Sequence, residues 1–301
     1  AGESVHDKLE RIRKILRERG ARWTFVSSLD DIAWITNLRS SDIQYNPLFY
    51  AFLFISLSKA VLFINKDRLS GDVLENVKRN FAIESYDDAE VLLPSLIRGT
   101  GLYSPDKTAA LFIGTVGSKR NIPSRDISTD LKSIKNKAEL DGMRRAHILD
   151  GAAYVSFLAK LDKLNGIYTE TMISDALERE RKRIEGYIGP SFAPISAFGA
   201  NGAIVHYRAD TEKPSNVMGH GLLVLDTGSQ FSMGTTDVTR TLFFGMEPTE
   251  EEKRDYTLVL KGHLALQSQI FPKGTRGVQL DAIAKQFLWN NYSAFFHGTG
   301  H

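Results

Sequence analysis

Apolar residues recur along the first part of the chain with a period that changes between helical and strand spacing. Residues 4–19 place apolar side chains at helical spacing, with Ser4 as the candidate N-cap and Gly20 just beyond. An apolar and β-branched run predicts a strand at 23–26. We expect further elements in this order: a short helix at 30–35, a hairpin of strands at 49–55 and 60–64, helices near 67–79 and 87–98, and strands at 81–86 and 108–113. The alternation predicts an α/β domain over residues 1–132.

A different pattern begins at about Ser133. Thr249 with Glu252 has the spacing of a capping box and predicts a helix start. We expect long helices at 137–161 and 169–184, a block of strands between 192 and 244, and helices at 249–271 and 280–289. Two helices, a strand block and two more helices predict an α+β domain over residues 133–301.

Two carboxylates fall within one predicted hairpin. Asp226 ends the apolar run Leu222–Leu225, which predicts a buried strand, and Asp237 follows a turn that contains Gly228 and Gly234. The hairpin would bring the two carboxylates together on neighbouring strands. Buried anions repel each other and lose hydration, and a divalent cation between them removes both costs. The alternative, a surface hairpin whose aspartates cap turns, fits Asp226 poorly because apolar residues lead it into the interior.

Three histidines are further candidates. His297 and His301 are separated by Gly-Thr-Gly, which argues against a helix and lets a metal or substrate approach the backbone. Phe295 and Phe296 precede them and suggest burial. His206 ends a short apolar run that predicts a strand. By itself, such a histidine is more often a packed core residue than a catalytic one.

Composition narrows the class of protein. The 301 residues are enough for two domains, and 42% hydrophobic with 25% charged residues is ordinary for a globular protein. A net charge of +2 gives no reason to expect a nucleic acid or a membrane surface as partner. The absence of cysteine excludes disulfides and thiolate chemistry, and no apolar run approaches the length of a membrane helix. We therefore expect a cytoplasmic protein.

Several segments together resemble one enzyme family. They are SFAPISAFGANGAIVHY (191–207), LLVLDTGSQFSMGTTDVTRT (222–241), VLKGHLALQSQIFPKGT (259–275) and FHGTGH (296–301). In order and spacing they resemble the Xaa-Pro aminopeptidase (aminopeptidase P) family, which has the creatinase or pita-bread fold. AWITNLRSSDIQYNP (33–47) looks like the middle domain of its three-domain members. The resemblance implies a middle domain followed by the first part of a pita-bread catalytic domain.

The resemblance also assigns site residues. It implies that Asp226, Asp237 and His301 bind metal, that His206 contacts substrate and transition state, and that His297 lines the same pocket. Two manganese ions are implied, although oxygen ligands with one imidazole would also suit cobalt, iron or zinc. The family completes its site with two glutamates on later strands. Because this sequence stops at His301, we expect it to be the N-terminal piece of a longer polypeptide.

The implied function is a metalloaminopeptidase, with His206 and His297 as its catalytic and substrate-binding residues. It would release the N-terminal residue from peptides with proline in second position, using a hydroxide that bridges the metal ions, and we expect a homodimer. A prolidase, which cleaves Xaa-Pro dipeptides, shares the ligand pattern, but segment 33–47 favours aminopeptidase P. Creatinase has the fold without metal ligands, and Asp226 with Asp237 disfavours it. A non-catalytic pita-bread module that binds peptides or proteins is the remaining alternative.

Overall fold

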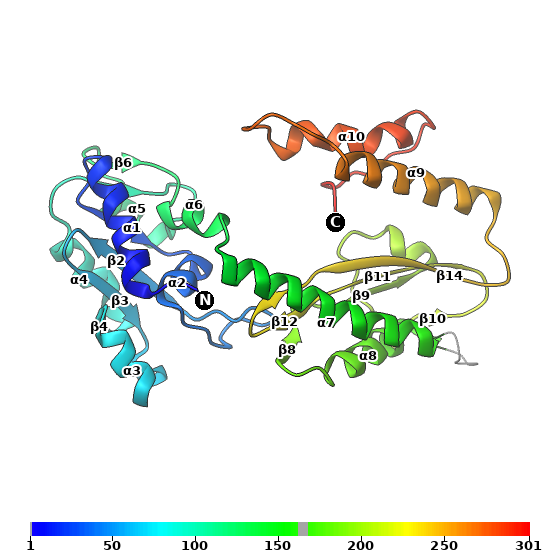
Figure 1. Ribbon diagram of the computed structural model, residues 1–301, viewed down its shortest axis with the longest axis horizontal. Coiled ribbons are helices and arrows are strands. Elements are labelled where there is room, and N and C mark those ends of the chain that lie inside the picture. The colour runs from blue at the N-terminus through cyan, green and yellow to red at the C-terminus, as the bar shows by residue number, and fades with distance from the viewer. Residues whose placement is uncertain (1, 162–167) are drawn as a thin grey trace. The chain divides into compact units, whose positions relative to one another are not determined.

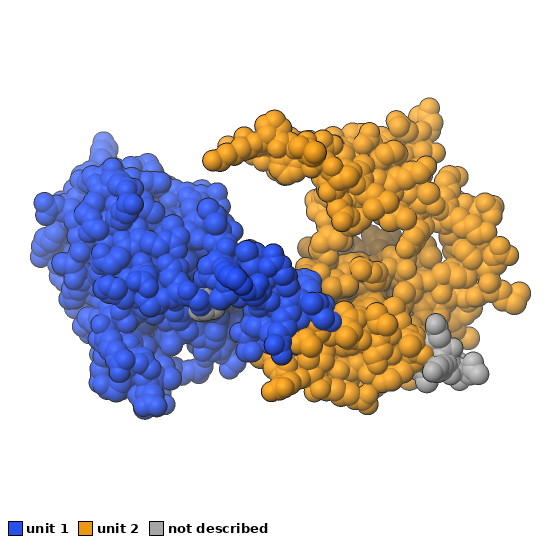
Figure 2. Space-filling model, in the orientation of Figure 1, with its two compact units in different colours: residues 1–148, 230–234 blue, residues 149–229, 235–301 orange. Residues whose placement is uncertain are grey.

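The structure, a computed structural model, describes residues 2–161 and 168–301 (Figure 1). The chain forms two compact units, residues 1–148 with 230–234 and residues 149–229 with 235–301 (Figure 2). Helix α7 (Lys137–Leu161), predicted with these bounds, has residues in both units. The division into domains at residues 132 and 133 stays a prediction. Among the described helices, none is long and apolar enough to cross a membrane.

The first unit is built on a mixed sheet of strand order β4-β3-β2-β1-β5-β6. Its strands are β1 (Trp23–Val26), β2 (Ala51–Ser56), β3 (Ala60–Ile64), β4 (Ala82–Glu84), β5 (Gly101–Tyr103) and β6 (Ile122–Pro123). Its helices are α1 (Val5–Glu18), α2 (Leu29–Thr36), α3 (Gly71–Lys78), α4 (Ala89–Leu96), α5 (Ala110–Val116) and α6 (Ile127–Ser133). The predicted hairpin of β2 and β3 is confirmed, with Phe54 opposite Val61.

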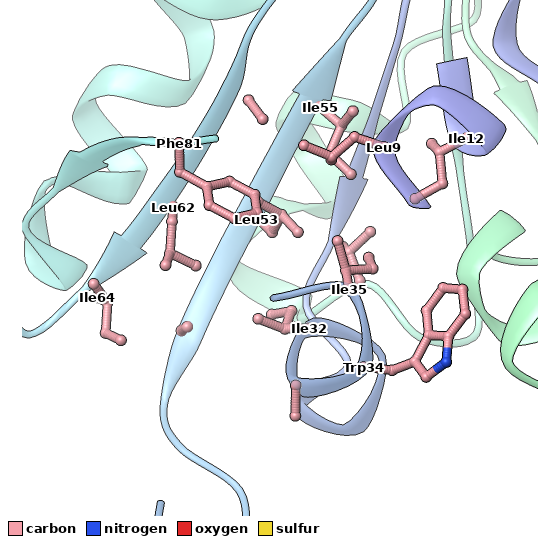
Figure 3. Close-up of a cluster of buried hydrophobic side chains, with 14 of the residues drawn as sticks. Leu9, Ile12, Ile32, Trp34, Ile35, Leu53, Ile55, Leu62, Ile64 and Phe81 are labelled. Atoms are coloured by element: carbon pink, nitrogen blue, oxygen red, sulfur yellow. The ribbon is translucent and has the colours of Figure 1, made fainter. Parts of the chain in front are cut away.

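Strand alternation gives the two faces of this sheet different cores. In β2, Leu53 and Ile55 belong to a largely aliphatic cluster, while Phe52 and Phe54 belong to an aromatic one. The aliphatic face packs against helices α1 and α2, as the close-up of that cluster shows (Figure 3). The aromatic face packs against α4 and α5. Helices therefore cover both faces, which confirms the α/β character predicted for this part of the chain.

One predicted element of this unit is wrong. The segment 108–113 was expected to be a strand, whereas residues 110–116 form helix α5 and the strand next to β1 is Gly101–Tyr103. Short apolar runs do not distinguish the two structures by composition. The buried positions decide the matter, because Phe112 and Val116 lie four residues apart, which is the spacing of one helical face.

Acidic and basic groups meet beneath α2 and α6. Asp31 is fully buried and accepts a hydrogen bond from Thr129 Oγ1 at 2.7 Å. The Nζ atoms of Lys107 and Lys132 lie 3.3 and 2.8 Å from its carboxylate oxygens. Asp126 is also buried, and burial together with the charge of Asp31 raises the pKa of Asp126 to about 6. Asp126 is therefore an unfavourable anion at neutral pH.

The second unit carries the predicted strand block. Its strands are β7 (Tyr168–Thr169), β8 (Tyr187–Pro190), β9 (Ile195–Phe198), β10 (Asn216–Val217), β11 (Gly221–Thr227), β12 (Ser229–Phe231), β13 (Gly234–Thr235) and β14 (Val238–Phe244), some residues of β12 and β13 being assigned to the first unit. Its further helices are α8 (Glu170–Arg181), α9 (Glu250–Gln267) and α10 (Gly277–Trp289). The main sheet has the order β14-β11-β9. Tyr154 and Phe157 of α7 and Leu177 of α8 pack on it against Leu223 and Leu225.

Of the two helices at the end of this unit, α9 begins as the sequence predicts, whereas α10 begins at Gly277, earlier than the predicted residue 280. Thr249 Oγ1 accepts a hydrogen bond from the backbone N–H of Glu252 at 3.2 Å, and Glu252 accepts one in return from the backbone N–H of Thr249 at 2.8 Å. This completes the predicted capping box of α9. Helices α9 and α10 cross so closely that a Cβ on Gly262 would lie 2.1 Å from the carbonyl oxygen of Ala284.

A substitution at Gly101 tests the packing of the first sheet. A Cβ there would lie 2.2 Å from the ring of Trp23, which is buried and cannot swing into solvent. We expect Gly101→Ala to lower the free energy of unfolding by about 1–3 kcal/mol in urea titrations. Gly114→Ala is the matched control, because no atom lies within 4 Å of its added Cβ and the site is inside helix α5. It should instead stabilise by about 0.5–1 kcal/mol.

The raised pKa of Asp126 predicts a pH dependence of stability. Because the folded protein holds this proton more tightly than the unfolded chain, the free energy of unfolding should fall as pH rises from about 4 to about 6. Asp126→Asn removes this loss, so its stabilisation should be near zero at pH 4 and reach about 1–2 kcal/mol above pH 6. Asp130→Asn, at an exposed carboxylate in α6, the helix that Asp126 precedes, should show no such gain. Equal pH profiles for the Asp126 variant and the unchanged protein would contradict the assignment.

Candidate metal centre

Strands β11 and β14 form the predicted hairpin, and their register positions the first carboxylate. The strands pair antiparallel, with Asp226 opposite Thr239 and Thr227 opposite Val238. Burial alternates along β11, so that Leu223 and Leu225 face the core. Asp226 therefore points to the opposite face of the sheet from the core leucines.

Three predicted ligands converge on that face. Asp226, Asp237 and His301 each offer one ligand atom, and these atoms all lie within 4.8 Å of one another. His301 Nε2 lies 3.1 Å from Asp237 Oδ1 and 3.8 Å from Asp226 Oδ1. The histidine comes from the segment that follows α10, sixty-four positions beyond Asp237 in the sequence. The fold thus brings together all three of the residues that the family resemblance named as metal ligands.

A hydrogen bond across the hairpin orients the first carboxylate. Thr239 Oγ1 donates to Asp226 Oδ1 at 2.7 Å, from the position directly opposite in the ladder. Such a bond restricts the rotation of the carboxylate. Thr239 was not among the predicted site residues, although its place opposite Asp226 follows from the hairpin itself.

The exposure of the two carboxylates differs from the expectation. The side chain of Asp226 is 20% exposed, but that of Asp237 is 50% exposed, so the prediction of two buried anions is wrong for Asp237. Asp237 lies in the short connection between β13 and β14, directly after the buried Thr236. Partial desolvation still raises the pKa of Asp237; His301 opposes the rise, and the negative charge of Asp226 adds to it.

The donor set fits a divalent cation. Two carboxylates and one imidazole offer oxygen and nitrogen ligands, the combination that manganese, iron, cobalt and zinc accept in proteins. The mutual repulsion that raises the pKa of Asp237 would be relieved by a positive ion between the carboxylates. These residues are therefore suited to hold such an ion.

His206 lies in a different local structure from the one predicted. Residues 199–203 form a 3₁₀ helix and residues 204–206 a bend and turn, so the strand predicted to end at His206 is absent; the exposed His206 has a left-handed φ of 56°. The sequence Gly-Ala-Asn-Gly favours such a turn. Exposure also removes the alternative of a packed core histidine. The next residue is anchored, because Tyr207 donates its hydroxyl hydrogen to the buried carboxylate of Glu170 at 2.8 Å.

His297 is exposed as well. Its Nδ1 lies 2.8 Å from the carbonyl oxygen of Gly298, and its ring stacks on Phe295 at a centroid distance of 4.7 Å. Phe296 is 99% exposed, so the burial expected for this segment is wrong, whereas the absence of a helix at 297–301 is confirmed. The cluster of ligand atoms among the described residues includes neither His206 nor His297.

Two buried charged residues near the hairpin were not predicted from the sequence. Asp150 of α7 and Arg181 of α8 are almost fully inaccessible, and their side chains form an ion pair at 2.7 Å. The sequence did contain a signal, because Asp150 falls at helical spacing among Ala146, Ala153 and Phe157 on the apolar face of α7. A carboxylate in such a position requires partners.

Comparison with known proteins identifies the family of this chain. Residues 1–139 match the model of the Creatinase/Prolidase N-terminal domain, and residues 141–301, more than half of the chain, match that of Metallopeptidase family M24. The chain belongs to metallopeptidase family M24. The resemblance found in the sequence is confirmed, as is the predicted order of an α/β domain and a pita-bread domain.

Two relatives of this chain carry the same name. The chain is 40% identical over 319 aligned positions to the probable Xaa-Pro aminopeptidase P of Paracoccidioides lutzii, and 41% identical over 315 to that of Sclerotinia sclerotiorum. Both alignments cover 100% of this chain and 52% of the relative. The chain therefore spans about half the length of the curated relatives it matches.

Solved M24 structures share the fold. The X-prolyl aminopeptidase of Caenorhabditis elegans, described as a cytosolic enzyme with a di-nuclear active site, superposes with a TM-score of 0.94 at 31% identity, covering 100% of this chain and 51% of that one. The prolidase of Pyrococcus horikoshii superposes with a TM-score of 0.73 at 18% identity, covering 95% of this chain and 78% of that one. The second likeness concerns the fold alone.

Removing one negative charge from the cluster of Asp226, Asp237 and His301 tests whether the cluster binds a metal ion. Asp237→Asn keeps the size of the side chain but replaces an anionic ligand by a neutral amide, so calorimetry should show Mn²⁺ affinity lowered by at least about tenfold. Circular dichroism should show an unchanged fold, because Asp237 lies at the surface. Asp255→Asn is the matched control, since that side chain is 49% exposed on α9 and outside the cluster. Equal Mn²⁺ affinity in the two variants would remove Asp237 from the ligand set.

Proposed function

We propose that this protein is a metal-dependent aminopeptidase that releases the N-terminal residue from peptides with proline in second position. The observation that carries the proposal is the convergence of Asp226, Asp237 and His301 on one face of the hairpin. Membership of a metallopeptidase family and the names of the relatives at about 40% identity support it.

In this proposal the three converging residues hold the metal. Asp226 and Asp237 provide anionic oxygen ligands, and His301 provides a neutral nitrogen ligand. The bound ions supply Lewis acidity, which makes water a stronger nucleophile near neutral pH. We propose manganese, in two ions, because the sequence resembles a manganese-dependent family and the C. elegans relative is described as di-nuclear. Thr239 holds Asp226 in the orientation that ligation requires.

We propose that His206 and His297 contact the substrate. His206 is exposed, and its side chain can donate a hydrogen bond to the oxygen that gains charge when the scissile carbonyl is attacked. Its backbone position is fixed from the next residue, because Tyr207 is hydrogen-bonded to Glu170, and Glu170 also accepts from the backbone N–H of Phe198 at 2.7 Å. His297, also exposed, is proposed to contact the bound peptide.

A specialised site for proline has a chemical reason. A bond to the proline nitrogen lacks the N–H that peptidases commonly bind, and the ring fixes the backbone angle φ of that residue. Prolidase activity, limited to Xaa-Pro dipeptides, is the second candidate, because a prolidase shares the fold. The named relatives at about 40% identity favour the aminopeptidase. We further propose a cytosolic homodimer, the compartment being that described for the C. elegans relative.

The role of His206 gives the sharpest test of activity. With Mn²⁺ and a tripeptide that has proline second, His206→Gln in the full-length protein should lower kcat about 10²–10³-fold and change KM less, because the lost interaction forms mainly in the transition state. His263→Gln, at an exposed histidine of α9, should leave both constants unchanged.

Substrate controls separate the candidate functions. A tripeptide with alanine second should be cleaved poorly, and an Xaa-Pro dipeptide should be cleaved no faster than the proline tripeptide. Rapid cleavage of the alanine peptide would contradict proline specificity, and cleavage of the dipeptide alone would assign a prolidase. Binding of the proline tripeptide without any turnover in the presence of Mn²⁺ would assign a binding module.

A further inference from the structure

A buried ion pair lies between helices α7 and α8. Arg181 Nε donates to Asp150 Oδ1 at 2.7 Å and Arg181 Nη2 donates to Asp150 Oδ2 at 3.1 Å, which is a bidentate arrangement. Asp150 is 0% and Arg181 2% exposed. The mechanism proposed above uses neither residue.

Asp150 also holds both sides of the hairpin connection. Ser229 Oγ donates to Asp150 Oδ1 at 2.7 Å, and Thr236 Oγ1 donates to Asp150 Oδ2 at 2.8 Å. Ser229 and Thr236 bond to each other as well, through Thr236 N to Ser229 O at 2.8 Å and Ser229 N to Thr236 Oγ1 at 3.0 Å. We call Asp150, Arg181, Ser229 and Thr236 the clamp. One carboxylate thus accepts four hydrogen bonds and fixes two segments of the hairpin to the helices.

The two hairpin residues of the clamp, Ser229 and Thr236, lie close to the candidate ligands in the sequence. Thr236 directly precedes Asp237, and Ser229 follows Asp226 by three positions. The hydroxyl groups of Ser229 and Thr236 point toward Asp150 of α7, whereas Asp226 faces away from the core leucines and Asp237 is half exposed. Space at this point is limited, since a Cβ on Gly228 would lie 2.1 Å from Ser191 Oγ and 2.2 Å from the carbonyl oxygen of Thr236.

We propose that Asp150 and Arg181 are positioning residues for the metal site, which hold Asp226 and Asp237 at ligand spacing before metal binds. This inference rests on the proposed metal-dependent function. Two carboxylates that repel each other would otherwise separate in the metal-free protein, and each ion bound would have to bring them back. Supporting interactions that fix ligands in advance raise metal affinity.

Stability alone does not account for this arrangement. A buried ion pair can be replaced by apolar side chains of similar volume with little loss of stability, and sometimes with a gain. Apolar side chains cannot accept the hydroxyl hydrogens of Ser229 and Thr236. The feature that only a carboxylate provides here is the directional attachment of both sides of the hairpin.

The test removes the clamp while keeping the helices packed. In the full-length protein, the double variant Asp150→Leu with Arg181→Met replaces the ion pair by an apolar pair, and Ser229→Ala removes one hydroxyl and leaves the ion pair intact. Ser156→Ala is the matched control, because Ser156 of α7 donates to Glu180 of α8 at 3.0 Å, a hydrogen bond that joins the same two helices without involving the hairpin. Each variant is measured for Mn²⁺ affinity by calorimetry, for Tm, and for amide hydrogen exchange of residues 226–238 without metal.

We expect the double variant to lose about 10–100-fold in Mn²⁺ affinity, and its Tm to fall as well, because the buried hydroxyl groups of Ser229 and Thr236 lose their acceptor. Ser229→Ala should lose less affinity, and both variants should exchange the hairpin amides faster. Ser156→Ala should leave affinity and hairpin exchange unchanged. If the double variant does not fold, the comparison of Ser229→Ala with Ser156→Ala decides.

Unchanged Mn²⁺ affinity in the folded clamp variants would overturn the positioning role and leave the proposed function standing. Equal losses of affinity in Ser229→Ala and Ser156→Ala would also overturn it, because the effect would then follow general stability. Failure of the unchanged protein to bind Mn²⁺ would instead overturn the proposed metal site, and with it this inference.

Discussion

The antiparallel pairing of β11 with β14 is the constraint on which the candidate site depends. Its register places Asp226 opposite Thr239 and leaves Asp237 just before β14, so two negative charges end up within ligand distance of each other. An isolated hairpin would not hold that arrangement, because like charges repel and a two-stranded ribbon is marginally stable in water. Helices α7 and α8 pack on one side of the sheet and hold the strands in place. On the other side, His301 lies beside the two carboxylates.

Several helices and strands could be predicted from the sequence because the signals that specify them are local. The helical spacing at the start of the chain, the capping box at Thr249 and the apolar run before Asp226 each specify their element within a few neighbouring residues. The hairpin pattern alone indicated Asp226 and Asp237 as candidate metal ligands, whereas His301 could be assigned to the same site only through the family resemblance, since no local rule connects His301 with residues more than sixty positions earlier. Their convergence is a property of the tertiary fold.

The failures have a common physical origin. Segment 108–113 was assigned to a strand because a short apolar run fits both structures, and tertiary packing against the aromatic face of the sheet selected the helix. The environments of His206 and Phe296 were misjudged because apolar neighbours in sequence do not ensure burial. Asp150 was missed because its partners come from other elements, and no spacing rule connects α7 with the two ends of a hairpin connection.

The alternation of the hairpin between its two faces also bears on how such a protein can change over evolutionary time. Ligand side chains project from one surface of the ribbon, and the bonds that hold the ribbon to the helices leave from the other. Replacement of Asp226 or Asp237 would therefore abolish the proposed metal binding without removing the attachments of the backbone that carries these residues. A lineage could in this way lose the proposed catalysis in a single step and keep a folded domain, which would then be available for selection as a binding scaffold.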